Sequence, residues 1–275
     1  VLLASASTID ITAKVVGGVA LALAGFAVRG ALGAILAGGV GSLLMVLAVF
    51  RRDTKAATDH TMSETPTVDS GWIDIIATLL AFGGLTALVT LDAVLIKHQF
   101  ADDVAATYAV LSVAGRSLFW ATGAITTVLL PIVARQAGAG DRGRGSLWLG
   151  LAITLAVAGS GEVAFLVAPS LIVGLLFGST YLAAAPLLPI FGLGSLSLSL
   201  GSVVLTWLVA QGKRAGAVIV PIAAIGQVAV ILSGPDGLAD ALARIVAVNG
   251  ATLAALIAAA LMRDRPTMQP ATVDA

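Results

Sequence analysis

Positive charge is unevenly distributed along this chain of 275 residues. Ten of its 15 Lys and Arg residues fall in four short polar segments, separated by apolar stretches long enough to cross a bilayer twice. The ten are Arg51, Arg52 and Lys55; Arg135, Arg142 and Arg144; Lys213 and Arg214; and Arg263 and Arg265. Because the cytoplasmic loops of membrane proteins are rich in Lys and Arg, this alternation predicts a polytopic membrane protein with these segments in the cytoplasm.

The composition agrees with a lipid environment. Hydrophobic residues make up 59% of the chain and charged residues 11%, whereas soluble domains have about 45–50% and about 25%. So few charges do not cover a surface that faces water. The chain has no cysteine, and its two histidines, His60 and His98, lie apart in polar breaks. We therefore expect no metal site, no resident cofactor and no nucleic acid partner.

The apolar stretches divide into eight candidate spans, judged against the ~20 residues that a transmembrane helix requires. They run roughly from 6–28, 31–50, 73–96, 104–134, 147–176, 182–211, 216–233 and 240–262. The break at 51–71 is the longest and most polar, which is typical of a linker between two bundles. We expect an all-α polytopic membrane helix bundle in the cell membrane, with this linker and the C-terminal tail in the cytoplasm.

Several segments, in order, resemble a known family. They are LDAVLIK (91–97), YAVLSVAGR (108–116), VLLPIVAR (128–135), LLFGSTYLAAA (175–185) and AQGK (210–213). Their order and spacing are similar to those of the multidrug/oligosaccharidyl-lipid/polysaccharide exporter superfamily, in its polysaccharide-biosynthesis and lipid II flippase branches. The family plan has two lobes of six helices each.

That resemblance implies a domain plan for the chain. The last two helices of an incomplete first lobe would occupy 1–50, and a cytoplasmic linker 51–72. A complete six-helix second lobe would occupy 73–263, and a cytoplasmic tail 264–275. On this plan the chain is the C-terminal part of a longer protein that has four more helices before it.

Charged residues inside the predicted spans are the candidates for a functional site, because each is costly in a bilayer. Arg116 and Glu162 lie at similar depths, ~18–20 Å, on consecutive antiparallel spans. We expect them to form a direct or water-bridged pair. Such a pair either locks two helices together or faces a cavity, where it binds an anionic substrate or couples transport to an ion.

Three further charged residues are weaker candidates. Lys14 follows Asp10 by one turn, which favours a local pair or a side chain that reaches the interface, although it could also meet a phosphate in a cavity. Arg244 follows Asp240 in the same way, and a pair at the outer face is expected. Asp92 is expected at the outer end of its span, where capping of the helix end is the simplest role.

The sequence favours a transporter over an enzyme. The predicted outer loops are short and hold no His–acid cluster beyond Lys97-His98 and Asp102-Asp103, and no phosphate-binding Gly-Lys-Ser/Thr loop is present. We expect a flippase that moves a lipid-linked oligosaccharide or polysaccharide precursor by alternating access. Its partners would be polysaccharide-synthesising enzymes. A proton or sodium gradient, sensed by Glu162, would supply the energy. The alternatives are a drug or small-solute exporter of the same superfamily and a non-transporting membrane scaffold.

Overall fold

The computed structural model describes residues 68–138 and 143–262, which are helical almost throughout and contain no strand. The helices, in chain order, are α3 (Val68–Gln99), α4 (Asp102–Gly138), α5 (Arg144–Val167), α6 (Pro169–Phe177), the 3-10 helix η2 (Ser179–Leu187), α7 (Leu188–Ala210), α8 (Gly216–Leu232) and α9 (Leu238–Leu261). The expected spans at 6–28 and 31–50, Lys14 and the tail at 264–275 lie outside the described residues, as does the linker except for 68–72, which begins α3.

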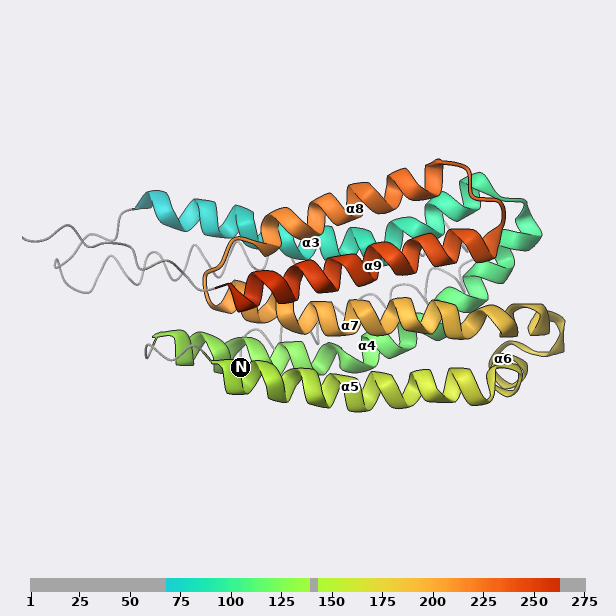
Figure 1. The fold of residues 1–275 in the computed structure, drawn as a ribbon, viewed down its shortest axis with the longest axis horizontal. Coiled ribbons are helices and arrows are strands. Elements are labelled where there is room, and N and C mark those ends of the chain that lie inside the picture. Colours follow the sequence, from blue (N-terminus) through green and yellow to red (C-terminus); the bar gives the residue numbers. More distant parts are fainter. Residues whose placement is uncertain (1–67, 139–142, 263–275) are drawn as a thin grey trace, which may run out of the picture. The chain divides into compact units, whose positions relative to one another are not determined.

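The long helices run alongside one another as a bundle (Figure 1). α7 occupies the middle of the packing, against α4, α5 and α9, and α3 pairs with α8. Glycines allow the close approaches: a Cβ atom on Gly194 of α7 would lie 3.2 Å from Val246 of α9, and one on Gly84 of α3 would lie 2.9 Å from the nitrogen of Pro221 in α8. Small residues serve this packing role in membrane bundles.

Five of the described helical segments are long and apolar enough to cross a membrane. They are Trp72–Gln99, Asp102–Gln136, Arg144–Val167, Ser179–Ala210 and Leu238–Leu261. Gly216–Leu232 is apolar but shorter, at 17 residues. The prediction of an all-α bundle suited to a membrane is confirmed at this level, whereas the count of eight spans and the two-lobe plan stay predictions.

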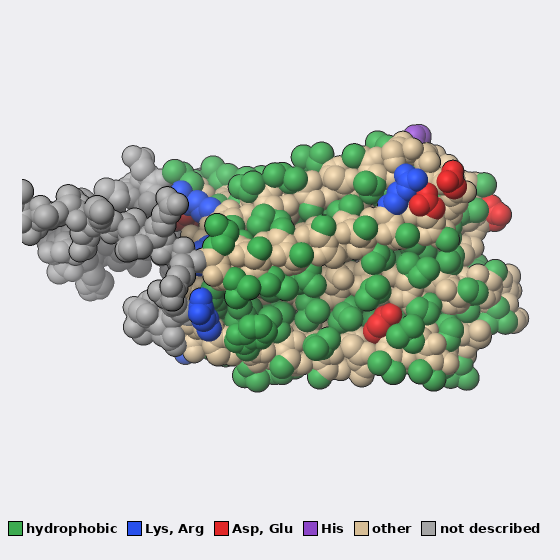
Figure 2. All heavy atoms as spheres, in the orientation of Figure 1, with side chains coloured by type: hydrophobic (Ala, Val, Ile, Leu, Met, Phe, Trp, Pro, Cys, Tyr) green, Lys and Arg blue, Asp and Glu red, His purple; other side chains and the backbone are tan. Residues whose placement is uncertain are grey.

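The outside of the bundle is apolar. Large hydrophobic side chains cover the face in Figure 2, and many are more than half exposed, such as Leu79, Leu171, Val167 and Ile225. A water-soluble protein seldom exposes apolar patches of this extent. Lipid is the medium in which such a surface is stable.

One span prediction was wrong in its extent. The span expected at 147–176 is divided, because α5 ends at Val167 and the nine-residue α6 begins at Pro169. Proline has no N–H for the preceding turn and its ring crowds the carbonyl four residues earlier, which favours the break between α5 and α6. The span expected at 182–211 agrees with the segment Ser179–Ala210, which begins as η2, containing Pro186, and continues as an α-helix from Leu188.

The tryptophans differ in their surroundings. Trp72 and Trp148 lie near the helix ends that carry the basic segments, and both are well exposed. Trp207 is buried, and its Nε1 donates to the carbonyl of Gly143 at 3.1 Å. Trp120 lies halfway along α4 and is 67% exposed.

Candidate functional site

A buried ion pair joins α3 to α4. Arg116 Nη2 donates to Asp92 Oδ1, and the two side chains are 22% and 6% exposed. Tyr108 adds a hydrogen bond from its hydroxyl to Asp92 Oδ2, 2.5 Å, and is itself fully buried. Tyr108 and Arg116 are eight residues apart, so they lie on one face of α4 and both reach the same carboxylate.

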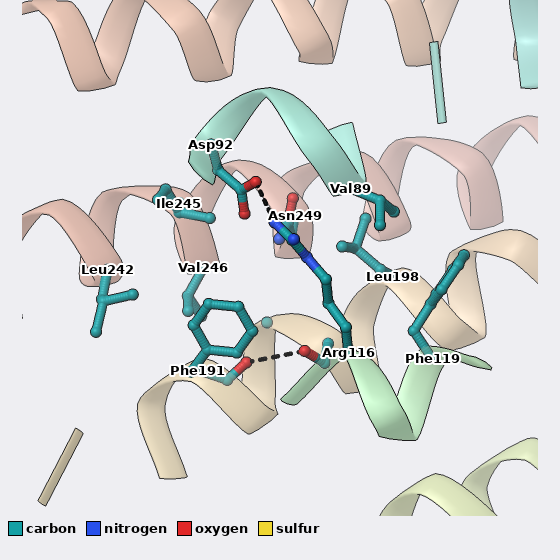
Figure 3. A pocket seen from close by; sticks show the side chains of 12 residues that line it. Val89, Asp92, Arg116, Phe119, Phe191, Leu198, Leu242, Ile245, Val246 and Asn249 are labelled. Carbon is teal, nitrogen blue, oxygen red and sulfur yellow. Dashed lines mark hydrogen bonds and ion pairs between the residues drawn. The ribbon is translucent and has the colours of Figure 1, made fainter. Parts of the chain in front are cut away.

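This ion pair borders a small cavity among four helices. The cavity has a volume of about 20 Å³, enough for one water molecule. Its polar lining comes from Asp92 of α3, Arg116 of α4, Ser195 of α7 and Asn249 of α9, and Phe191 closes one side (Figure 3). Asn249 Oδ1 is buried and has no hydrogen-bond partner. The cavity is therefore polar enough for a water or an anion's oxygen, but too small for a sugar.

Glu162 lies elsewhere, where α5 packs on α7. Its side chain is 7% exposed, and its buried Oε2 has no hydrogen-bond partner. The carboxyl group lies directly against α7 at Gly192, where an added Cβ atom would be 1.9 Å from Oε2. The close packing of the two helices at this glycine is what accommodates the carboxyl group.

The expected pair of Arg116 and Glu162 is wrong. Both residues lie inside the bundle, as their similar depths predicted, but Arg116 faces α3 and Glu162 faces α7. α4 presents Leu118 to α5, where a Cβ atom on Gly161 would lie 2.2 Å from Leu118 Cδ2, whereas Arg116 is bonded to Asp92 of α3. Depth along a helix does not specify which side of the helix a residue faces.

The other sequence candidates have mixed outcomes. The pair of Arg244 with Asp240 is confirmed, at 2.7 Å, and Arg244 Nη1 also donates to Ser233 Oγ at 2.7 Å, which attaches α9 to the end of α8. Asp92 is a buried partner of Arg116 and not a residue that caps the outer end of a helix, so that expectation was wrong.

Two residues of this region were not singled out as site residues from the sequence. Tyr108 was noted only within the family resemblance, although its spacing from Arg116 is a signal that the two share a helix face. Asn249 lines the cavity. Elsewhere in the bundle, Gln227 Nε2 donates to the Leu88 carbonyl of α3 at 3.0 Å.

The His, Cys, Asp and Glu side chains of the described residues do not suggest a metal centre. In residues 68–138 and 143–262, no three His, Cys, Asp or Glu side chains converge on one point. Asp92 is bonded to Arg116 and Tyr108, and Glu162 lies alone against α7. What the arrangement offers chemically is one partly exposed guanidinium group beside a cavity and one buried carboxyl group without a partner.

No family model matches this chain, and no curated protein or solved structure matches it. The likeness to flippases therefore stays an expectation that rests on the residues quoted for it. The function is argued below from the arrangement of charged residues in the bundle.

Proposed function

We propose that the chain belongs to a flippase-like secondary transporter. It would carry a lipid-linked oligosaccharide or polysaccharide precursor across the cell membrane by alternating access. The observation that carries the proposal is the Asp92–Arg116 pair, which lies inside an apolar helix bundle and borders a cavity. A charged residue at the centre of a bilayer costs at least ~2.5–3.5 kcal/mol, so charged residues that remain there mark transport paths more often than structural contacts.

Arg116 is the residue proposed to bind the substrate. A guanidinium group has five N–H donors in a fixed planar arrangement that suits phosphate oxygens, and Asp92 accepts a bond from one of them at Nη2. The pyrophosphate of a lipid-linked saccharide has the matching acceptors. In this proposal Asp92 neutralises Arg116 when the substrate is absent and is displaced by the phosphate when it binds.

The conformation described here is closed to such a substrate. A cavity of about 20 Å³ holds one water, not a sugar. Transport therefore requires the helices that line the cavity to separate, with the bilayer as the surrounding partner and a proton or sodium gradient as the energy source. The basic helix ends would face the cytoplasm, where polysaccharide-synthesising enzymes would supply the substrate.

The test is export by the protein reconstituted in liposomes. A lipid-linked oligosaccharide is supplied on the basic side, and its arrival on the other side is measured with an impermeant lectin. Arg116→Ala should lower the rate by about tenfold or more, because a hydrogen bond to a charged group is lost. Arg244→Ala is the matched control, because Arg244 is bonded to Asp240 and Ser233 and does not line the cavity, and it should export at nearly the normal rate. Normal export by Arg116→Ala contradicts the proposal.

One observation favours a second candidate, the non-transporting scaffold. Glu162 is largely buried where two helices meet, as a purely structural residue would be. The same liposomes separate the two functions. A scaffold gives no export in any variant, and a drug or small-solute exporter of the same architecture moves a test solute but not the saccharide.

A further inference from the structure

A stripe of α5 residues at four-residue spacing runs between two contacts of α5 with α7. The stripe consists of Gly150, Thr154, Ala158 and Glu162, of which the last three are buried side chains in an otherwise apolar helix. A Cβ atom on Gly150 would lie 3.1 Å from Val203, and the Glu162 carboxyl group lies against Gly192. The two helices are thus antiparallel in a register that places Thr154 level with Ser199.

Buried oxygens that have no partner are concentrated on α5 and α7. They are Glu162 Oε2 and Thr154 Oγ1 of α5, and Ser199 Oγ and Thr206 Oγ1 of α7. Each of these residues is at least nine-tenths buried. In the described part of the chain the remaining unpartnered buried oxygens belong to Gln227 and Asn249. The carboxyl group therefore lies among groups that do not compensate a negative charge.

Within residues 68–138 and 143–262, no cation faces Glu162 from the helices packed around it. α7 has no titratable residue between Leu188 and Ala210, and neither has α6. The other charged residue of α5 is Arg144, 18 positions earlier and so ~27 Å away along the helix. On α4, Arg116 is bonded to Asp92 and Tyr108 donates to the same carboxylate, while η2 contributes Tyr181, which is 38% exposed.

We propose that Glu162 is a proton-binding site, and that release of its proton separates α5 from α7 at this end. An ionised carboxylate without a cation or a donor is strongly unfavourable in an apolar contact. When a water molecule accepts the proton, the carboxylate must gain water as a donor, and the buried Oε2 can gain one only if the helices part at Gly192. The inference does not depend on the transported substrate, and it holds for a transporter or a scaffold.

The rest of the interface supports separation at one end. At the basic end, Trp207 Nε1 donates to the carbonyl of Gly143, which joins α7 to the start of α5. At the Glu162 end, α5 stops at Val167, and Ala168 leaves the helical conformation with φ −138° and ψ 49°. The last turns of α5 are therefore not continued by a rigid helix. Separation is expected at the Glu162 end, while the Trp207 contact holds the other.

The first experiment detects the proton itself. The full-length protein in lipid nanodiscs is stepped through pH while infrared difference spectra record the C=O stretch of a protonated carboxyl group. A band that disappears as pH rises, and that is absent in Glu162→Gln, is expected. A spectrum of Glu162→Gln identical to that of the unsubstituted protein at every pH overturns the proposal.

The second experiment measures the separation. The chain has no cysteine, so pairs of introduced cysteines can carry spin labels without background. Val163→Cys with Leu193→Cys reports on the Glu162 end, and both positions are well exposed. Leu149→Cys with Val209→Cys reports on the other end. The first distance should lengthen as pH rises and the second should not, and Glu162→Gln should keep the first distance short. Equal lengthening at both ends, lengthening that persists in Glu162→Gln, or no lengthening overturns the proposal.

A glycine substitution tests the contact between Glu162 and α7 without changing Glu162 itself, in case Glu162→Gln alters folding. An added methyl group at Gly192 would lie 1.9 Å from Oε2, so Gly192→Ala should displace the carboxyl group and lengthen the first distance even at low pH. Gly201→Ala is the matched control on the same helix, because its nearest contact would be an ordinary 3.7 Å to Leu256. A low-pH distance in Gly192→Ala equal to that of Gly201→Ala contradicts the proposed role of the Glu162 contact.

Discussion

Two carboxyl groups in this bundle are buried to a similar degree and have opposite surroundings. Asp92 accepts bonds from Arg116, Tyr108 and the backbone N–H of Ala93. Glu162 lies against the backbone of α7, and its buried Oε2 has no partner. Burial alone therefore does not decide what a carboxyl group does in an apolar bundle; its neighbours do.

The difference follows from which helices meet. The interface of α3 and α4 carries a cation and a phenol, so a charge on Asp92 is compensated where it lies. α7, opposite Glu162, has only small and apolar residues and hydroxyl groups. The first interface is expected to be stable with its charges present, and the second only with its carboxyl group neutral. Removal of the Asp92 carboxyl group should therefore lower the free energy of unfolding, whereas removal of the Glu162 carboxyl group should raise it.

The largest effect is expected from removing one member of the Asp92–Arg116 pair. Asp92→Leu leaves a mostly buried guanidinium without its partner, and it should lower the free energy of unfolding by about 3 kcal/mol. Denaturation in detergent, followed by circular dichroism, measures the change. The double variant Asp92→Leu/Arg116→Met should recover most of the loss, because no unpaired charge remains. A double variant as unstable as the single one would show that the Arg116 charge is not the cause.

A smaller loss is expected for the hydroxyl group that completes this cluster. Tyr108→Phe removes a donor from a buried carboxylate and should cost about 1.5 kcal/mol in the same denaturation experiment. The chain's other tyrosine provides the control, because Tyr181 is 38% exposed and Tyr181→Phe should change stability little. Equal effects of the two substitutions would contradict the contribution assigned to the Tyr108–Asp92 bond.

The smallest effect is expected at Glu162, with the opposite sign. Glu162→Met replaces an unpartnered carboxyl group by an apolar side chain of similar length, and it should raise the free energy of unfolding by about 1 kcal/mol at neutral pH. Thr154→Val tests the same idea without a charge, since it removes another unpartnered oxygen of the interface, and should be neutral or slightly stabilising. A loss of stability in Glu162→Met comparable with that of Asp92→Leu would remove the distinction between the two carboxyl groups.

The sequence predicted the features that depend on the spacing of residues within one helix. Long apolar stretches gave helices close to the expected positions, and the spacing of Asp240 and Arg244 predicted a pair that the structure confirms. The division of the 147–176 span was missed. Pro169, two residues after the end of α5, begins a separate helix there.

The candidate site was harder to predict, because it depends on how each helix is rotated about its axis. Arg116 and Glu162 were assigned correctly to the interior, but not to each other. The faces that α4 turns toward α3 and α5 are set by the packing of Leu118 and its neighbours against glycines, and that packing is a property of the assembled bundle. The partners of Asp92 therefore became evident only from the structure.

The positions of the tryptophans have a spectroscopic consequence. Trp120 exposes its ring halfway along α4, whereas Trp72 and Trp148 expose theirs near one end of the bundle. In a bilayer, bromine atoms near the ends of the acyl chains would quench the fluorescence of Trp120, and bromine atoms near the headgroups that of Trp72 and Trp148. The protein thus carries its own markers of two depths, and these report where the bundle lies in the membrane without any added label.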